Sequence, residues 1–198
     1  MGAAPSLHLG TAEQVEVLAS MEPVVLQEME AHKERRNLWF PNELVNADAE
    51  SPADWEEEMV QVRRLARDLP DTVRVAVALN LLTEEGLPHF HRLIAVHFSE
   101  NSPWSDWNNM WTAEEDRHGC VLRDYVRDAR LFDMGALERL QYSYIEAGFY
   151  PEWEQDPYRL LAYTSLQEKA TQISHANTGR AAAGRAPVAT RAGAPGGR

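Results

Sequence analysis

Residues 73–83, VRVAVALNLLT, constrain the fold of this chain more than any other segment. Drawn as a helix, the segment carries apolar side chains on nearly every face, which is typical of a buried helix and not of a surface one. It is far shorter than the ~20 apolar residues needed to span a bilayer. We therefore expect a long helix that opens at Asp71 and lies at the centre of a helical bundle.

The rest of the chain also has helical periodicity, and no segment alternates in the way of a strand. Thr11 and Gln14 fit a capping box, while Ser51-Pro52 and Asp156-Pro157 are typical of helix starts. Six helices with short connections predict an all-α bundle. The expected helices span 11–36 (kinked or broken at Pro23), 52–68, 71 to about 98, about 107 to 130, 134–148, and 157 to about 177.

Charge and cysteine content exclude several classes of protein. The formal net charge of −12 argues against general binding of nucleic acids, which requires neutralisation of phosphates. No transmembrane segment or signal peptide is expected from the sequence. Cys120 is the only cysteine, so an intrachain disulfide is impossible; we expect a buried thiol in a reducing, cytoplasmic setting.

The two ends of the chain differ from the predicted bundle. Residues 1–10 are expected to be an N-terminal tail and 11–178 the helical domain. In residues 179–198, eighteen of the twenty are Gly, Ala, Arg or Pro, and none is acidic, aromatic or a large aliphatic. Such a segment cannot form a core, and we expect it to be disordered.

The stretch WTAEEDRHG contains Glu115 and His118, which share one face of a helix and are able to bind one ion. An acidic, solvated helix face is the alternative. Carboxylate-bridged di-iron bundles combine Glu-x-x-His pairs with lone glutamates on other helices. Glu84 and Glu168 are lone acids within apolar helices, where an unpaired charge costs several kcal/mol. Carboxylates at a helix end or bound to a partner are the alternative for these two.

Four stretches together resemble the soluble acyl-carrier-protein desaturases, a ferritin-like di-iron family: LWFP at 38–41, TEEGLPHF at 83–90, WTAEEDRHG at 111–119 and YTSLQEKATQISHANT at 163–178. The resemblance covers roughly residues 12–178. It implies a ferritin-like bundle and O₂-dependent insertion of a double bond into a fatty acyl chain in fatty acid biosynthesis. The implied partners are an acyl carrier protein that carries the substrate, a ferredoxin-type electron donor, and a second copy in a homodimer.

The same resemblance implies a role for individual residues. Glu84 matches a terminal carboxylate ligand, Glu115 a bridging ligand, His118 an imidazole ligand, and Glu168 a ligand on a further helix; members of the family bind two irons per chain.

Three more residues lie in the matching stretches. Thr171 matches a threonine that faces the oxygen pocket and helps proton delivery. Trp39 matches a tryptophan on the electron path, with a core aromatic as the alternative. His175 is expected to be structural or to contact a ligand, not to bind metal itself.

The chain departs from the family pattern after Thr178. The family continues with a helix that carries a second Glu-x-x-His, whereas this sequence holds no other such pair and no Glu or His beyond Thr178. We therefore expect a bundle that is incomplete at the C-terminus, and a chain that by itself lacks two of six ligands. The alternative function is an inactive, truncated remnant that acts at most as a helical binding module. The tail composition suggests a frameshifted or truncated reading frame of a GC-rich gene.

Overall fold

A computed structural model describes residues 12–44, 50–98, 100–153 and 156–183. All the regular structure in these ranges is helical, which confirms the predicted all-α class. The helices are α1 (Ala12–Ser20), α2 (Glu22–Arg35), a short 3-10 helix η1 (Pro41–Glu43), α3 (Pro52–Arg67), α4 (Asp71–Glu85), α5 (Leu87–Ala95), α6 (Pro103–Asp128), α7 (Met134–Ala147) and α8 (Pro157–Ala182).

The helices begin where capping side chains and prolines occur. The Ser51 hydroxyl accepts a hydrogen bond from the Asp54 amide at the start of α3, and Asp156 accepts from the first two amides of its helix, α8. Proline follows each of these caps, at a position where the missing N–H costs nothing. Ser102-Pro103 repeats this signal, so α6 begins at Pro103. The predicted start near residue 107 is therefore wrong.

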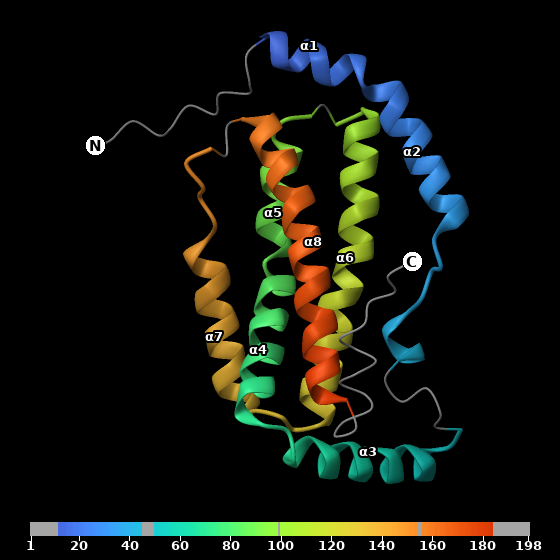
Figure 1. Cartoon of the computed structure of the whole chain (residues 1–198), viewed down its shortest axis with the longest axis vertical. Helices are drawn as coiled ribbons and strands as arrows, with labels where there is room; N and C mark the ends of the chain where they lie inside the picture. Colours follow the sequence, from blue (N-terminus) through green and yellow to red (C-terminus); the bar gives the residue numbers. More distant parts are fainter. Residues whose placement is uncertain (1–11, 45–49, 99, 154–155, 184–198) are drawn as a thin grey trace.

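Figure 1 shows α4, α6, α7 and α8 running side by side, with α5 continuing the line of α4 and α3 crossing one end of the bundle. α4 packs against α6, α7 and α8, while α6 packs against α2, α3, α4, α5 and η1, so the helices of the described part of the chain are arranged around α6. α2 packs along the outer side of α6, and α1 lies at the adjoining end of the bundle (Figure 1). This arrangement is consistent with a ferritin-like bundle.

Two helices predicted as continuous are broken. Gly86 separates α4 from α5, because Pro88 has no N–H to donate to the carbonyl of Glu84 and the helix cannot continue. In the same way, Pro23 lies in the first turn of α2, and the helix predicted over 11–36 divides at Met21. The break at Pro23 was one of the two outcomes predicted for that helix, whereas the break at Gly86 was not predicted.

α8 extends to Ala182, four residues into the segment predicted to be disordered. Gly179 and Ala182 are buried, and Ala182 packs in the main core cluster. Alanine has the highest helix propensity, and small side chains allow a helix to approach its neighbours closely. The prediction therefore failed for 179–182, whereas residues 184–198 lie outside the described part of the chain.

The expectation that the 73–83 segment is buried on nearly every face is also wrong. Val73 and Val77 are buried, but Val75 is 57% and Leu79 59% exposed. These two side chains project from the opposite side of α4, and no described helix covers them. The segment is apolar on two faces, and the described residues bury one of them.

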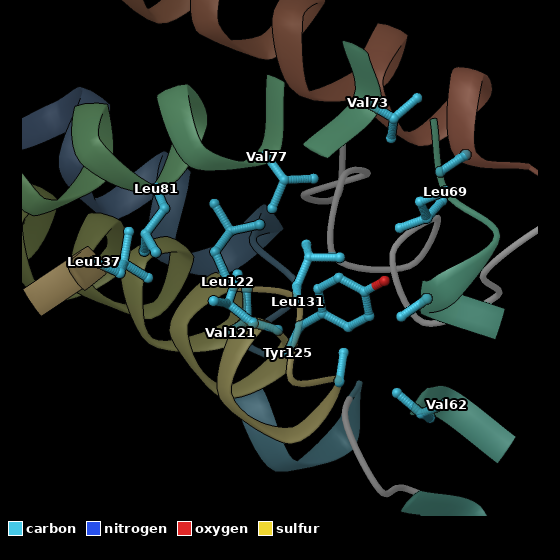
Figure 2. Packing of buried hydrophobic residues seen from close by; sticks show 14 of the residues in the cluster. Val62, Leu69, Val73, Val77, Leu81, Val121, Leu122, Tyr125, Leu131 and Leu137 are labelled. Carbon is cyan, nitrogen blue, oxygen red and sulfur yellow. The ribbon is translucent and has the colours of Figure 1, made fainter. Parts of the chain in front are cut away.

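Buried apolar side chains of the described residues form two clusters. The larger one joins α3, α4, α6 and α7 near one end of the bundle, through residues such as Val77, Leu81 and Tyr125 (Figure 2). The smaller one, towards the other end, contains Leu93, Ile94 and Leu160 with several aromatic rings packed around them. Along each long helix, the ionisable residues singled out from the sequence fall between the two clusters.

Among the described residues, no helix combines the length and the apolar character that crossing a membrane requires.

Candidate metal centre

The Glu115–His118 pair lies on the face of α6 that points into the bundle. His118 Nδ1 is 2.8 Å from Glu115 Oε2, as expected for side chains three residues apart on a helix. Burial favours the neutral imidazole, but the hydrogen bond to Glu115 and the charges of Glu115 and Glu84 outweigh it and raise the pKa of His118. The imidazole therefore sits in a field that attracts positive charge.

Glu84 approaches this pair from α4. Its Oε2 lies 3.9 Å from His118 Nδ1, and its side chain is only 9% exposed. One ligand atom each from Glu84, Glu115 and His118 lies within 4.8 Å of the others. Two carboxylates and one imidazole at this separation are able to bind a metal ion such as Fe(II).

Glu168 and Thr171 of α8 complete the walls of a small cavity of about 20 Å³ that Glu84 and Glu115 also line. Burial raises the pKa of Glu168 to about 7, and the charges of Glu115 and Glu84 add to this effect. A divalent cation between these carboxylates would relieve their repulsion, so the donor set fits the group that the sequence predicts. The Thr171 hydroxyl donates back to the carbonyls of Gln167 and Glu168.

His175 makes the closest contact to a predicted ligand. Its Nε2 lies 2.6 Å from Glu84 Oε1, and the residue is only 4% exposed. Since a carboxylate only accepts hydrogen bonds, Nε2 carries the hydrogen. The second oxygen of Glu84 remains directed towards His118. One turn away, the buried Asn80 bonds to Ser174 and Thr178, so a polar strip links α4 and α8.

Trp39 lies in the non-helical segment between α2 and η1, and its ring stacks on the His118 ring with 5.8 Å between centroids and an angle of 15°. Arg117 holds it in two ways. Its Nη1 donates to the Trp39 carbonyl at 2.7 Å, and its guanidinium carbon lies 4.9 Å from the centre of the indole ring. Arg117 was not among the residues predicted from the sequence, although it directly precedes the predicted ligand His118.

Glu114 points away from Glu115, as their 100° separation on the helix predicts, and joins α6 to α2. Its carboxylate contacts His32 at 2.9 Å and Arg36 at 2.5 Å. Burial opposes its ionisation, but the hydrogen bonds from Arg36 and His32 prevail and lower the pKa of Glu114. This ion pair anchors the end of α2 directly before the segment that carries Trp39.

Cys120 is exposed, so the prediction of a buried thiol is wrong. The residue lies on the outer face of α6, and its sulfur contacts Asp116 one turn earlier. No pattern along the chain indicates which face of α6 lacks a neighbour.

The sequence matches the family described as fatty acid desaturase over residues 13–190. A protein named "Putative acyl-[acyl-carrier-protein] desaturase DesA1" from Mycobacterium tuberculosis is 34% identical over 84% of this chain and 51% of its own length. The seed-specific, chloroplastic stearoyl-[acyl-carrier-protein] 9-desaturase of Brassica napus is 32% identical over 89% of this chain and 46% of its own length. The chain thus spans about half the length of these relatives, and it belongs to the fatty acid desaturase family.

Proposed function

We propose that this chain is an acyl-[acyl-carrier-protein] desaturase polypeptide whose carboxylate and imidazole side chains hold iron. The observation that supports the proposal most directly is the convergence of Glu84, Glu115 and His118 ligand atoms within 4.8 Å, in a member of the fatty acid desaturase family. Glu168 contributes a further carboxylate at the wall of the same cavity.

Iron suits both the ligands and the proposed reaction. Carboxylates with imidazole favour Fe(II) and leave positions open for O₂. Bound iron would supply, with O₂, the strong oxidant that amino-acid side chains cannot provide and that removal of hydrogen from a saturated chain requires.

The surrounding residues prepare the site for this ion. His175 holds one oxygen of Glu84 and thereby leaves the other oxygen free to face His118. Trp39, stacked on His118, is proposed as the entry point of electrons. Thr171 is proposed to deliver protons within the cavity, for which its hydroxyl must rotate away from the helix carbonyls.

The substrate and partners follow from the relatives. Their printed names indicate acyl chains attached to acyl carrier protein. For this chain we propose the same substrate class, with O₂ and a ferredoxin-type electron donor as co-substrates, a homodimer as the assembly and the cytoplasm as the location.

Iron binding is the first test. The purified chain is loaded with Fe(II) without oxygen, passed through a desalting column and analysed for iron per chain. We expect retained iron in the wild type and none in the Glu115→Gln, His118→Gln double variant. Glu138→Gln on the exposed side of α7 is the matched control and should bind as the wild type does. Equal retention in all three proteins contradicts the proposed site.

Turnover is the second test. The iron-loaded chain is incubated with O₂, reduced ferredoxin and a stearoyl-acyl carrier protein, and the released fatty acids are analysed for a double bond. We expect an unsaturated product that depends on O₂. Bound iron without product restricts the chain to metal binding and contradicts the desaturase assignment.

A further inference from the structure

Three tryptophans of α6 form a row that starts at the candidate metal centre. Trp111 lines the cavity together with Glu84 and Glu115, and its side chain hydrogen-bonds to the Glu168 carboxylate. Its ring stacks on that of Trp107, with 6.2 Å between centroids and an angle of 19°. Trp107 in turn meets Trp104 edge to face at 6.1 Å. The spacings of four and three residues place all three rings on one side of the helix.

The row also borders a groove between α2 and α6. The groove has a volume of about 440 Å³, and its walls include all three tryptophans with Val25 and Met29. Trp104 itself is only 8% exposed, and its indole N–H donates to the carbonyl of Leu18 at 2.9 Å. A small molecule that enters the groove can therefore reach Trp104, which is otherwise buried.

Indole is among the most easily oxidised side chains, and neighbouring indoles in contact exchange electrons readily. Trp39, the indole that stacks on His118, has the Arg117 guanidinium over its face. A cation on the ring face disfavours the loss of an electron from that ring. Oxidation of Trp111 therefore competes well with oxidation of Trp39, although both rings lie beside the same site.

We propose that Trp111, Trp107 and Trp104 carry oxidising equivalents from the metal centre to the groove when no substrate consumes them. The inference rests on the proposed function only for the identity of the oxidant, an over-oxidised iron centre. Phe98 stacks on Trp104 at 4.9 Å, but benzene rings are much harder to oxidise than indoles, so the row ends at Trp104.

Each step moves one electron. With iron bound, Trp111 would give one electron to the oxidised centre, Trp107 one to Trp111, and Trp104 one to Trp107. A small reductant in the groove, such as a thiol or ascorbate, would then return one electron to Trp104 and itself be oxidised by one electron. The reductant would supply the electron overall, and the three indoles would end as they began.

The route is testable in the full chain without metal. Cys120 is the only cysteine and is exposed, so a ruthenium photo-oxidant can be attached to it on the same helix. A flash in the presence of persulfate as the electron acceptor produces Ru(III), which withdraws an electron from the protein, and O₂ then traps the hole as an oxidised tryptophan that peptide mapping locates. A Trp39→Phe background replaces the indole that stacks on His118 with a benzene ring, which is much harder to oxidise. We expect oxidation products at Trp104, despite its burial.

Trp107→Phe interrupts the row while keeping an aromatic ring in place. We expect this variant to lose the Trp104 product and to accumulate product at Trp111. Trp55→Phe on α3 is the control, because Trp55 is 40% exposed but lies outside the row; it should leave the Trp104 product unchanged. Circular dichroism and thermal unfolding establish that each variant is folded. Unchanged Trp104 oxidation in Trp107→Phe overturns the proposal.

Iron-loaded protein separates this inference from the proposed function. When the iron-loaded proteins are exposed to O₂ without acyl substrate, oxidised Trp104 should form in the wild type. In the iron-loaded Trp107→Phe variant, the oxidised residue should be Trp111. If the ruthenium experiment succeeds and the loaded protein shows no oxidised tryptophan, the route stands and the proposed iron chemistry fails. If Trp104 is oxidised equally in the loaded wild type and Trp107→Phe proteins, the route fails even though iron reacts.

Discussion

At the scale of single residues, the candidate centre brings carboxylates closer together than their charges favour. Glu84, Glu115 and Glu168 line one cavity, and Glu168 responds with a pKa raised to about 7 by burial and by its neighbours. His118 and His175 offset part of this repulsion through contacts with Glu115 and Glu84. A site of this kind is costly without a cation, which ties its stability to pH and to metal.

The raised pKa of Glu168 predicts that the metal-free protein loses stability as pH rises. The folded state retains the Glu168 proton above the ordinary carboxyl pKa of 4.5, whereas the unfolded state releases it. The contribution of Glu168 to the free energy of unfolding should therefore fall between about pH 4.5 and pH 7 and stay constant above. Urea titrations of wild type and Glu168→Gln across this range check this. The free energy of unfolding should change less steeply with pH in the variant than in the wild type. An equal pH dependence in both proteins contradicts the assigned pKa.

Removal of the His175 donor should weaken metal binding. His175→Phe keeps the ring volume but leaves Glu84 Oε1 without its partner, and loss of such a contact to a ligand typically costs about 10–100-fold in affinity. A competition titration against a chelator measures the Fe(II) affinity. His175→Gln retains an N–H donor and should lose less. Equal affinities in wild type and His175→Phe would show that the contact does not orient Glu84.

At the scale of elements, three helices position the centre, and each begins at a defined residue. α4 opens at Asp71 after Pro70, α6 at the Ser102 cap and α8 at the Asp156 cap. Glu115 and Glu168 lie well inside α6 and α8, whereas Glu84 is the next-to-last residue of α4; all three lie between two apolar clusters that pack on either side of them. The positions of Glu84, Glu115 and Glu168 are thus determined by packing over the length of each helix.

The cap of α8 offers an element-scale prediction. Asp156 accepts hydrogen bonds from the amides of Tyr158 and Arg159, and removal of such a cap costs about 0.5–2 kcal/mol. Asp156→Ala should lower the free energy of unfolding by this amount in chemical denaturation. Asp156→Asn retains an acceptor and should stay close to wild type. If alanine and asparagine behave alike, the cap does not contribute to the stability of the helix.

At the scale of the whole molecule, the bundle leaves apolar surface in contact with solvent. Val75 and Leu79 on α4 are more than half exposed, as are Leu166 on α8 and Tyr142 on α7. Exposed apolar surface of this extent promotes association between molecules. The described residues thus form a core around the candidate centre without enclosing α4.

Polar substitutions on the outer face of α4 should reduce association without loss of stability. Val75→Thr with Leu79→Gln removes apolar surface that is already exposed, so light scattering at increasing concentration should show less aggregate. Val77→Thr on the same helix is the matched comparison, because Val77 is 3% exposed. Burying its hydroxyl should cost about 1–3 kcal/mol. A similar loss of stability in both variants would show that the outer face is covered in solution.

Local patterns in the sequence were enough to predict the all-α class and most helix starts, and to single out four candidate ligands, of which Glu84, Glu115 and His118 have ligand atoms within 4.8 Å of one another. Capping residues, prolines and the three-residue spacing of Glu115 and His118 act within one helix, so they are readable without the fold. The break at Gly86 was equally local, since Pro88 produces it, but the continuous apolar pattern concealed it. The extension of α8 to Ala182 was missed because small residues carry little hydrophobic signal.

Only the tertiary structure decided which faces are paired. Three contacts join segments far apart in the chain: His175 bonds to Glu84, the Trp39 ring stacks on His118, and the Arg117 guanidinium lies over the Trp39 ring. The exposure of Val75, Leu79 and Cys120 has the same origin. The sequence by itself determined the helices and the residue types of the site, because these depend on neighbours along the chain. Burial and distances between helices depend on packing, which no spacing within one helix specifies.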